Sequence, residues 1–452
     1  MTRIAIVGAG PAGYEAALVA VQLGAEVTLV DRDGVGGMCV LADCVPSKTF
    51  IATSEAMTTL SHADLVGVHT EGRVTAEVAE VHARVKALAL AQSDDIRQRL
   101  MREGVRLESG AARLLGGGRV QVGSSVLAAD VVLLATGAHP RVVPGAEPDG
   151  QRVLDWRQLY DLPALPEHLV VVGSGVTGAE FASAYLAMGC QVTLVSSRDR
   201  VLPSEDPDAA EQLQQVFVRR GMRVLRGRAA AVARSADGVV VQLTDGSSVS
   251  ASHCLMTVGS VPNTGGMGLE EAGGELDAGG FVKVDRVSRT TAAGVYAAGD
   301  CTGVLMLASV AAMQGRIAMW HALGEAVAPL RLGTVAANVF TDPEVASVGV
   351  TQRQVDDGTV VARSVRLPLS TNPRAKMQGL TDGFVKLFCR PGSGTVLGGV
   401  VVAPRASELI LPVSMAVQNG LTAEQLAHTF SIYPSLGGSI TEAARQLMTH
   451  GV

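Results

Sequence analysis

Residues 2–13 read TRIAIVGAGPAG, an apolar segment that runs directly into the pattern Gly-x-Gly-x-x-Gly. In a strand–turn–helix unit the first glycine permits a tight turn, the second lets the backbone approach a pyrophosphate, and the third lets helix and strand pack closely. The helix N-terminus offers free N–H groups to the phosphates. These glycines are Gly8, Gly10 and Gly13. A second strand is predicted at residues 26–30, and Asp31 follows it, where a carboxylate binds a ribose hydroxyl. Together they predict a dinucleotide-binding unit.

The same pattern recurs at residues 169–178, which read LVVVGSGVTG, and its second strand is predicted at residues 192–195. The glycines of this repeat are Gly173, Gly175 and Gly178. Two dinucleotide sites in one chain favour two cofactors that exchange a hydride or electrons. Later in the chain, residues 294–300 (GVYAAGD) predict a strand that ends in Gly299 and Asp300. A carboxylate there can meet another part of a bound nucleotide.

Two cysteines lie five positions apart in residues 36–48, which read GGMCVLADCVPSK. The pattern Cys-x4-Cys is a poor zinc signature, because zinc sites use tighter spacing and a second ligand pair. On a helix, residues four or five apart can bring two sulfur atoms together on neighbouring turns. We therefore expect Cys39 and Cys44 to form a redox disulfide and expect no metal site. The alternative is that both are small buried apolar residues.

Composition narrows the class of protein. A length of 452 residues suits about three domains, and the 52 glycines and 47% hydrophobic residues suit an α/β protein. The formal charge of −6 gives no footprint for nucleic acid. No signal-peptide pattern precedes the first strand, no apolar run reaches the roughly 20 residues of a membrane helix, and the six cysteines form no secreted framework. We expect a soluble, cytoplasmic protein without integral membrane association.

Taken together, the motifs resemble those of the FAD-dependent pyridine nucleotide-disulfide oxidoreductases, a family that includes lipoamide dehydrogenase, glutathione reductase and mercuric reductase. The resemblance extends over essentially the whole chain, and further segments carry it: Ala135-Thr136-Gly137, Glu180, residues 259–263 (GSVPN) and residues 339–344 (VFTDPE). It implies an α/β fold with two Rossmann-like domains, for FAD and NAD(P), and an α+β C-terminal dimerisation domain. The implied boundaries are residues 1–147 and 268–332 for the FAD domain, 148–267 for the NAD(P) domain and 333–452 for dimerisation.

The resemblance also implies roles for single residues. Cys44 matches the cysteine that lies against the flavin, and Cys39 matches the one that faces the substrate. Lys48 and Glu180 match a pair in which the ammonium sits near the flavin, where preorganised charge stabilises the reduced form, and the carboxylate fixes it. The alternative is a purely structural salt bridge. The residues implied for FAD are Gly8, Gly10, Gly13, Asp31, Gly37, Lys48, Ala135, Thr136, Gly137, Gly299, Asp300 and Ala308. Those implied for NAD(P) are Gly173, Gly175, Gly178, Glu180, Ser196, Ser197, Arg198 and Gly259.

The chain departs from the family at its C-terminal motif. Disulfide reductases carry His-x-His-Pro-x-x-x-Glu there, and the second His acts as acid–base, oriented by the Glu. Residues 431–438 read SIYPSLGG, so Tyr433 replaces that His and Gly438 replaces the Glu. Tyrosine has an ordinary pKa of about 10, which makes Tyr433 a poor base in a position that typically contributes roughly 10²–10⁴-fold. His428 lies off the motif. Residues 444–452 contain no cysteine, which disfavours mercuric reductase.

These departures favour an acceptor that needs no thiol exchange, and the chain looks similar to a lipoamide dehydrogenase-like subgroup of NAD(P)H quinone reductases. Reduced flavin passes electrons directly to a quinone, and solvent supplies the protons. Three alternatives stay open: a dihydrolipoyl dehydrogenase or other disulfide reductase that uses Cys39 and Cys44, a soluble pyridine nucleotide transhydrogenase, and a non-enzymatic FAD-binding partner. The family resemblance further implies a homodimer with its active site at the subunit interface.

The preferred nicotinamide nucleotide is indicated in part. NADH enzymes of the family carry a Glu where this chain has Ser196, followed by residues 197–200 (SRDR). Hydroxyls and a guanidinium suit a 2′-phosphate, so we expect both nucleotides to bind with a preference for NADPH. The alternative is that Arg198 and Arg200 are solvated surface charges.

Outside the motifs, hydrophobic periodicity predicts a few further elements. A long exposed helix is expected over residues 76–100, and a second helix over residues 308–321. Near the C-terminus we expect a strand at residues 384–388 and helices at residues 407–418 and 422–428.

Overall fold

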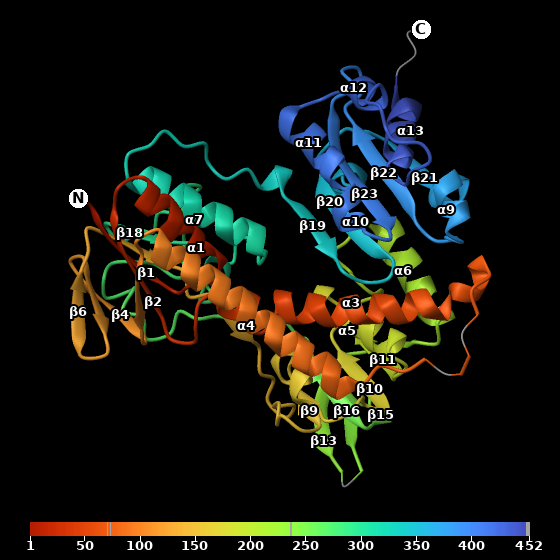
Figure 1. Ribbon diagram of the computed structural model, residues 1–452, viewed down its shortest axis with the longest axis horizontal. Helices are drawn as coiled ribbons and strands as arrows, with labels where there is room; N and C mark the ends of the chain where they lie inside the picture. The colour runs from red at the N-terminus through yellow and green to blue at the C-terminus, as the bar shows by residue number, and fades with distance from the viewer. Residues whose placement is uncertain (70, 73, 236, 449–452) are drawn as a thin grey trace. The chain divides into compact units, whose positions relative to one another are not determined.

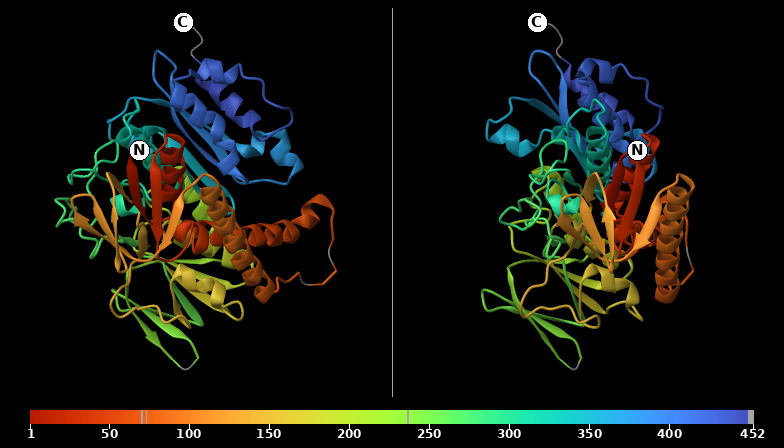
Figure 2. Two further views of the ribbon diagram at one scale, coloured as in Figure 1. Left: turned by 60° about the vertical axis from the view of Figure 1, so that its left-hand side comes forward. Right: turned by 90° about the vertical axis from the view of Figure 1, so that its left-hand side faces the viewer.

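The computed structural model describes residues 1–69, 71–72, 74–235 and 237–448. The last four residues of the cysteine-free C-terminal segment therefore lie outside the described residues. Contacts between residues divide the chain into two compact units. Figures 1 and 2 show the helices and strands of both units. Unit 1 comprises Met1–Thr49, Glu80–Arg141 and Val258–Leu330, and unit 2 comprises Phe50–Ala79, Val142–Thr257 and Arg331–Val452.

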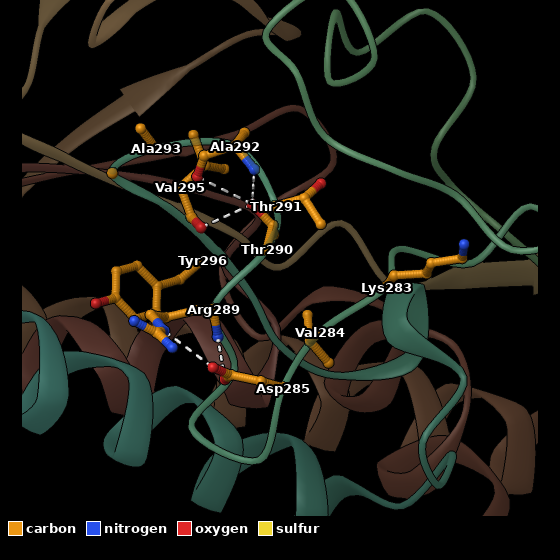
Figure 3. A pocket seen from close by; sticks show the side chains of 11 residues that line it. Lys283, Val284, Asp285, Arg289, Thr290, Thr291, Ala292, Ala293, Val295 and Tyr296 are labelled. Carbon is orange, nitrogen blue, oxygen red and sulfur yellow. Dashed lines mark hydrogen bonds and ion pairs between the residues drawn. The ribbon is translucent and has the colours of Figure 1, made fainter.

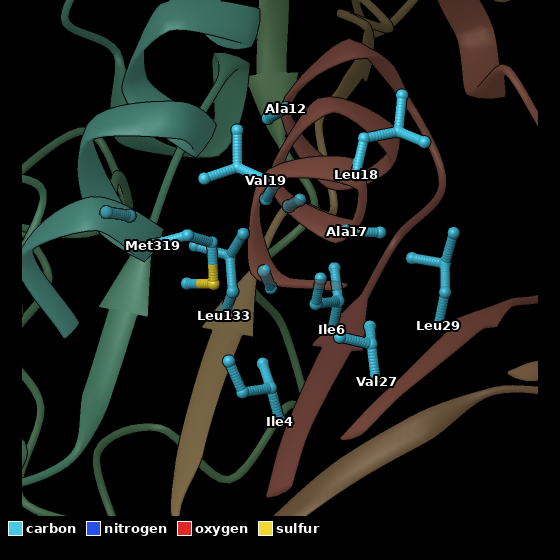
Figure 4. Close-up of a cluster of buried hydrophobic side chains, with 14 of the residues drawn as sticks. Ile4, Ile6, Ala12, Ala17, Leu18, Val19, Val27, Leu29, Leu133 and Met319 are labelled. Carbon is cyan, nitrogen blue, oxygen red and sulfur yellow. The ribbon is translucent and has the colours of Figure 1, made fainter. Parts of the chain in front are cut away.

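Unit 1 is built on a five-stranded parallel sheet in the order β18-β7-β1-β2-β3. Its strands are β1 (Arg3–Val7), β2 (Glu26–Asp31), β3 (Arg106–Ser109), β7 (Val131–Leu134) and β18 (Val295–Ala297). Helices α1 (Pro11–Gln22) and α7 (Ala308–Ala322) pack side by side. Ile6, Leu29 and Leu133 from the sheet meet Ala17 and Met319 from these helices in one buried cluster (Figure 4). This burial explains why the strands read as nearly continuous apolar runs.

Smaller elements complete unit 1. They are a three-stranded antiparallel sheet of β4 (Ala112–Gly116), β5 (Arg119–Val122) and β6 (Ser125–Ala128), a pair of β8 (Ala138–Pro140) and β17 (Ser260–Pro262), and the short helices α2 (Gly37–Leu41) and η3 (Asp300–Thr302). The short helix η1 (Ala63–Val66) belongs to unit 2. Two helices, α3 (Cys44–Ser61) and α4 (Val78–Arg102), run across the boundary between the units in sequence. Helix α4 confirms the long helix predicted for residues 76–100, and most of its side chains are exposed.

The first half of unit 2 repeats the parallel design, with strand order β12-β11-β10-β16-β9. The strands are β9 (Val153–Leu154), β10 (His168–Val172), β11 (Gln191–Ser196), β12 (Arg223–Arg226) and β16 (His253–Met256). Its main helices are α5 (Val176–Ala187) and α6 (Pro207–Arg219); η2 (Trp156–Asp161) precedes β10. An antiparallel sheet of β13 (Ala229–Arg234), β14 (Val239–Leu243) and β15 (Ser248–Ala251) is inserted between β12 and β16.

The second half of unit 2 is an antiparallel sheet in the order β19-β20-β23-β22-β21. The strands are β19 (Ala336–Val339), β20 (Glu344–Gly349), β21 (Arg363–Pro368), β22 (Phe384–Cys389) and β23 (Val396–Ala403). The helices are η4 (Leu332–Thr334), α8 (Gln352–Asp356), η5 (Leu369–Thr371), α9 (Pro373–Met377), α10 (Ala406–Leu409), α11 (Leu411–Asn419), α12 (Ala423–Ala427) and α13 (Gly438–Leu447). The predicted α/β class, with two Rossmann-like sheets and an α+β C-terminal part, is confirmed.

One helix prediction is wrong in detail. The single helix expected over residues 407–418 is divided into α10 and α11 at Ile410. Pro412 has no backbone N–H, so the carbonyl of Glu408 lacks its helical partner at that point. Helix α13 was not predicted, although it buries Ile440, Ala443 and Ala444.

Ion pairs join the two halves of unit 2. Lys386 on β22 contacts the carboxylates of Asp206 and Asp208 at 3.0 and 2.8 Å, and the Lys386 and Asp206 side chains are only 4% and 3% exposed. At the other end of α6, Arg220 contacts Asp342 at 2.9 Å. A buried charge that loses its partner is costly, so these pairs hold α6 against the antiparallel sheet. Within the described residues, no helix is long and apolar enough to cross a membrane.

Candidate active site

The first glycine turn of unit 1 is shaped by close backbone contacts. Gly8 has φ +105°, and a Cβ there would collide with the carbonyl oxygen of Ala135. A Cβ on Gly13 would collide with the carbonyl oxygen of Gly8. Gly10 differs, since nothing lies within 4 Å of the place its Cβ would take. The turn therefore leaves open space beside Gly10 at the N-terminus of α1, which is where a pyrophosphate fits.

Two neighbouring features border this turn. Gly37 has φ +58°, and a Cβ there would lie 2.9 Å from the Cα of Gly10. Asp31, at the end of β2, accepts a hydrogen bond from the amide of Ala9 at 2.6 Å. Its other oxygen accepts from the amides of Asp33 and Gly34 at 2.7 and 2.8 Å. Asp31 thus ties the glycine turn to the loop that follows β2.

The segment Ala135-Thr136-Gly137 lies beside the same turn. The amide of Ala135 donates to the carbonyl of Val7 at 2.7 Å, which continues the pairing of β7 with β1. The Asn263 side chain donates to the carbonyl of Thr136 at 2.8 Å, and its backbone amide donates to that of Gly137 at 2.9 Å. Asn263 therefore fixes this segment and joins the two motifs in space.

Asp300 is a poorly solvated carboxyl group on the same unit. It opens η3, after β18 and Gly299, and α7 begins at Ala308. Burial raises the pKa of Asp300 to about 6, and the nearby Asp43 adds to the effect. Among the described residues no group is recorded that donates a hydrogen bond to this carboxylate. Together with the open space at Gly10, a desolvated acceptor of this kind fits FAD, whose ribose and ribityl chain carry hydroxyl donors.

The two cysteines lie close together, but the helix geometry expected for them is wrong. Cys39 belongs to α2 and Cys44 opens α3, because the chain turns at Ala42 and Asp43, where the amide of Asp43 donates to the carbonyl of Met38 at 2.8 Å. The backbone leaves the helical conformation at Ala42, which has φ −140°. Both cysteines are half-buried thiols here.

The thiols interact with each other directly. The Cys44 thiol donates a hydrogen bond to Cys39, and this lowers the pKa of Cys39 although burial opposes the shift. The same bond and burial raise the pKa of Cys44. Lys48 also lowers the pKa of Cys39, whereas Asp43 and Asp300 raise it. The arrangement makes Cys39 the nucleophilic member of the pair.

Unit 2 repeats the glycine geometry. A Cβ on Gly173 (φ +114°) would collide with the carbonyl oxygen of Thr257, a Cβ on Gly178 would collide with that of Gly173, and the Cβ position of Gly175 is open. Thr257 was missed by sequence reasoning. Its hydroxyl donates to the carbonyl of Val172 at 2.9 Å and closes the turn from behind. Thr257 directly follows β16 as Ala135 directly follows β7, and this equivalence is the sequence signal that could have identified Thr257.

The residues predicted to recognise the adenosine end lie beyond β11. Ser196 is 1% exposed, whereas Ser197 and Arg198 are exposed. Gly259 has φ +95° and an open Cβ position, and its carbonyl accepts from the amide of Arg141 at 2.9 Å. Gly259 belongs to unit 1, so it is not grouped with the other residues predicted for NAD(P). Lys48 and Glu180 are likewise divided between unit 1 and unit 2.

Glu180 is held by a backbone group far away in the sequence. This residue of α5 is 3% exposed, and its Oε1 accepts a hydrogen bond from the amide of Phe340 at 2.9 Å. One helical turn on, Ser183 accepts from the amide of Asp342 at 3.2 Å. Phe340 is a contact that sequence reasoning missed, although residues 339–344 had been singled out as a motif. That motif supplies the amides that orient Glu180.

Tyr433 lies in the open. Its residue is 81% exposed, and it borders a hollow of about 300 Å³. Gly438 opens α13 and its amide donates to Ser435 at 3.2 Å, so it brings no carboxylate to the hollow. In the part of the chain that the structure describes, no histidine lines this hollow, and His428 ends α12 outside it. Glu442 at its rim is paired with Arg445 at 2.7 Å.

A second hollow, of about 540 Å³, lies in unit 1 and contains none of the predicted site residues (Figure 3). Its charged groups are already paired. Arg289 contacts Asp285 at 2.9 Å and Lys283 contacts Glu275 at 3.0 Å. We therefore assign it no part in the site.

The sequence of this chain is similar to family models and to known proteins. The model of the pyridine nucleotide-disulphide oxidoreductases matches residues 2–315, and the model of the dimerisation domain of the same proteins matches residues 335–444. The chain belongs to this family. Pyridine nucleotide-disulphide oxidoreductases use FAD and NAD(P)H, in agreement with the two glycine turns and the desolvated carboxyl group of Asp300.

Several pyridine nucleotide-disulphide oxidoreductases are similar over the full length. A protein of Mycobacterium tuberculosis named NAD(P)H dehydrogenase (quinone) is 57% identical over 466 residues, which cover 100% of this chain and 94% of the relative. The crystal structure of LpdA from the same organism superposes with a TM-score of 0.95 at 57% identity and covers 99% of this chain and 100% of that one. A dihydrolipoyl dehydrogenase of Chlorobaculum tepidum is 34% identical, covering 98% of this chain and 96% of the relative.

Proposed function

We propose that the protein is an NAD(P)H quinone reductase, which passes a hydride from NAD(P)H to bound FAD and electrons onward to a quinone. The observation that carries this proposal is the replaced acid–base pair, since Tyr433 is 81% exposed and Gly438 brings no carboxylate to the hollow. The higher identity to a quinone dehydrogenase than to a dihydrolipoyl dehydrogenase, 57% against 34%, supports it.

The chain's own residues would act as follows in this reaction. The turns at Gly10 and Gly175 admit the pyrophosphates of the two nucleotides, because each leaves open space at a helix N-terminus. Bound FAD supplies the hydride and electron chemistry. The carboxylates of Asp31 and Asp300 would accept hydrogen bonds from its hydroxyl groups. The ammonium of Lys48 would supply positive charge that stabilises the reduced form, and Glu180, whose carboxylate accepts from the Phe340 amide, is its predicted partner.

We also propose how the chain is organised for this chemistry. Residues 1–147 and 268–332 would form the FAD domain, 148–267 the NAD(P) domain and 333–452 the dimerisation domain. A homodimer would place its active site at the subunit interface, with Tyr433 reaching the partner. The exposed apolar residues Phe430 and Ile432, which closely precede Tyr433, support burial of the segment against a second subunit.

A second candidate is a disulfide reductase, and one observation favours it. The hydrogen bond from Cys44 that lowers the pKa of Cys39 prepares a thiolate for exchange. A quinone reductase has no need of that arrangement. The two functions therefore differ in whether Cys39 takes part in turnover.

Steady-state NADPH oxidation with quinones and with lipoamide separates them. We expect Cys39→Ser to leave quinone turnover within a few-fold of wild type, and wild-type lipoamide activity to be feeble, because the missing acid–base pair contributes roughly 10²–10⁴-fold. The double change Tyr433→His with Gly438→Glu is expected to raise lipoamide activity. Efficient lipoamide reduction by the wild type, lost together with quinone reduction in Cys39→Ser, would establish the disulfide reductase instead.

A further inference from the structure

The hydroxyl of Ser196 has no hydrogen-bonding capacity left for a nucleotide. It lies 2.7 Å from the Ser174 hydroxyl, accepts from the amide of Arg198 at 3.2 Å, and points its own proton at the carbonyls of Arg198 and Arg200, each 3.1 Å away. A hydroxyl has one donor and two acceptor sites. At 1% exposure Ser196 thus organises the loop that follows β11 rather than binding a ligand.

The sheet brings another cation to this loop. Ser196 and Arg226 are register partners at the carboxyl ends of β11 and β12, and the amide of Gly227 donates to the carbonyl of Ser196 at 2.8 Å. Nucleotides bind beyond the carboxyl ends of parallel strands. The Gly175 turn follows β10, and the strand order places β12 next to β11 on the side away from that turn.

Arg226 is held by an acidic residue of the same loop. Its guanidinium contacts the carboxylate of Asp199 at 2.6 Å, and the two side chains are 79% and 80% exposed. An exposed ion pair contributes little stability, so a phosphate dianion can take the guanidinium from Asp199. In the sequence, Arg198 and Arg200 flank Asp199 and Arg228 follows Arg226, so Asp199 is the acidic residue among these five.

We propose that Arg226 and Asp199 are the pair that selects the nucleotide: Arg226 binds the 2′-phosphate of NADPH, and Asp199 competes with that phosphate for the guanidinium. Arg is suited to this because its planar fork binds two phosphate oxygens at once. The inference rests on the proposed function only in that the protein uses a nicotinamide nucleotide. It moves the recognition of the phosphate from Ser196 to a neighbouring strand.

Arg223 provides a matched control. It is the first residue of the same strand and is also exposed, but it lies at the amino end. Burial lowers the pKa of His168 at the start of β10, and the charge of Arg223 lowers it further. Substitution of Arg223 removes the same charge from the same strand without touching the carboxyl edge of the sheet.

The test uses the flavin-loaded protein with 2′,5′-ADP and 5′-AMP as probes in titration calorimetry. Arg226→Gln should weaken 2′,5′-ADP binding about tenfold or more, since the charge-assisted hydrogen bonds from the guanidinium to the 2′-phosphate are lost. Binding of 5′-AMP should stay unchanged, and Arg223→Gln should bind both probes like the wild type. Asp199→Asn should strengthen 2′,5′-ADP binding. In turnover, Arg226→Gln should raise KM for NADPH with kcat retained and leave NADH unaffected.

Two results would overturn the inference: equal effects of Arg226→Gln and Arg223→Gln on 2′,5′-ADP, or equal losses of both probes in Arg226→Gln. Neither result concerns the electron acceptor. Conversely, selective loss of 2′,5′-ADP in Arg226→Gln supports the inference even if the protein reduces no quinone, in which case the proposed function alone fails.

Discussion

At the scale of single residues, the chemistry of the site depends on the protonation states of its thiol and carboxyl groups. One thiol donates to the other, so the two cysteines are unequal before any substrate arrives. The environments of the two carboxyl groups also differ, because Asp31 accepts three backbone hydrogen bonds whereas Asp300 is desolvated. Each inequality gives a pH-dependent measurement.

The first measurement concerns the reduced thiols. Because Cys44 stabilises the Cys39 thiolate, Cys39 should be alkylated by iodoacetamide at a pH below the ordinary thiol pKa of about 8.5. Cys44→Ala removes the donor, so the pKa of Cys39 rises and alkylation at pH 7 should slow by about tenfold. Cys44→Ser keeps a hydroxyl donor and should react nearly as the wild type does. An unchanged rate in Cys44→Ala would contradict the hydrogen-bonded pair; Cys39→Ser identifies the reacting thiol.

The second measurement concerns Asp300 in flavin-free protein. Its pKa is about 6 when folded and about 3.9 when unfolded, so folding favours the neutral acid. Stability is therefore full below pH 4 and is lost as the pH rises through 6, by about 3 kcal/mol at most. Asp300→Asn has no such penalty, so its melting temperature should exceed that of wild type by more at pH 7 than at pH 4. The same difference at both pH values would show that Asp300 is not desolvated.

At the scale of elements, the two glycine turns are built alike from different chain segments. In each, the first and third glycines meet backbone carbonyls, and the second faces open space. The second glycine thus serves ligand binding, and the other two serve folding. That separation makes the roles distinguishable by substitution.

Gly10→Val should fold and remain colourless, because a Cβ at Gly10 has no atom beyond its chain neighbours within 4 Å and the side chain occupies the space that admits the flavin pyrophosphate. Gly13→Val should fail to fold, since its side chain collides with the carbonyl of Gly8. Gly175→Val should stay yellow but lose affinity for NADPH. Circular dichroism and the visible flavin absorbance check all three, and a yellow Gly10→Val protein would disprove the assignment.

Local signals explain which elements could be predicted from the sequence. Strand β1, the glycine turns and helix α4 follow from hydrophobic period and glycine spacing, which act over a few residues. The end of α2 before Cys44 could not be predicted in this way, because Ala42 and Asp43, where the chain turns, carry no glycine or proline stop signal. The Phe340 amide lies 160 residues from Glu180 in the sequence, beyond the reach of any local signal. The sequence also gives no sign that the Ser196 hydroxyl is engaged in hydrogen bonds to its own loop.

At the scale of the whole molecule, the dimerisation-domain match predicts a defined association. Phe430 is fully exposed and Ile432 is 82% exposed in the single chain, which is costly for apolar side chains. Phe430→Asp with Ile432→Asp should convert a dimer into monomers in light scattering after size exclusion. Leu90→Asp is the control, since Leu90 on α4 is also exposed but lies outside residues 335–444. A wild-type monomer would contradict the prediction.

The buried contacts of Lys386 constrain which hybrids of two related genes encode a stable protein. A hybrid gene with one crossover between Asp208 and Lys386 draws the two carboxylates from one parent and the ammonium from the other. If the second parent lacks the lysine, the carboxylate of Asp206 is stranded without a counter-ion, at about 3–5 kcal/mol. Exchange of the C-terminal sheet alone is thus constrained by a helix more than 170 positions upstream. Inheritance of the two segments as a linked pair avoids that loss.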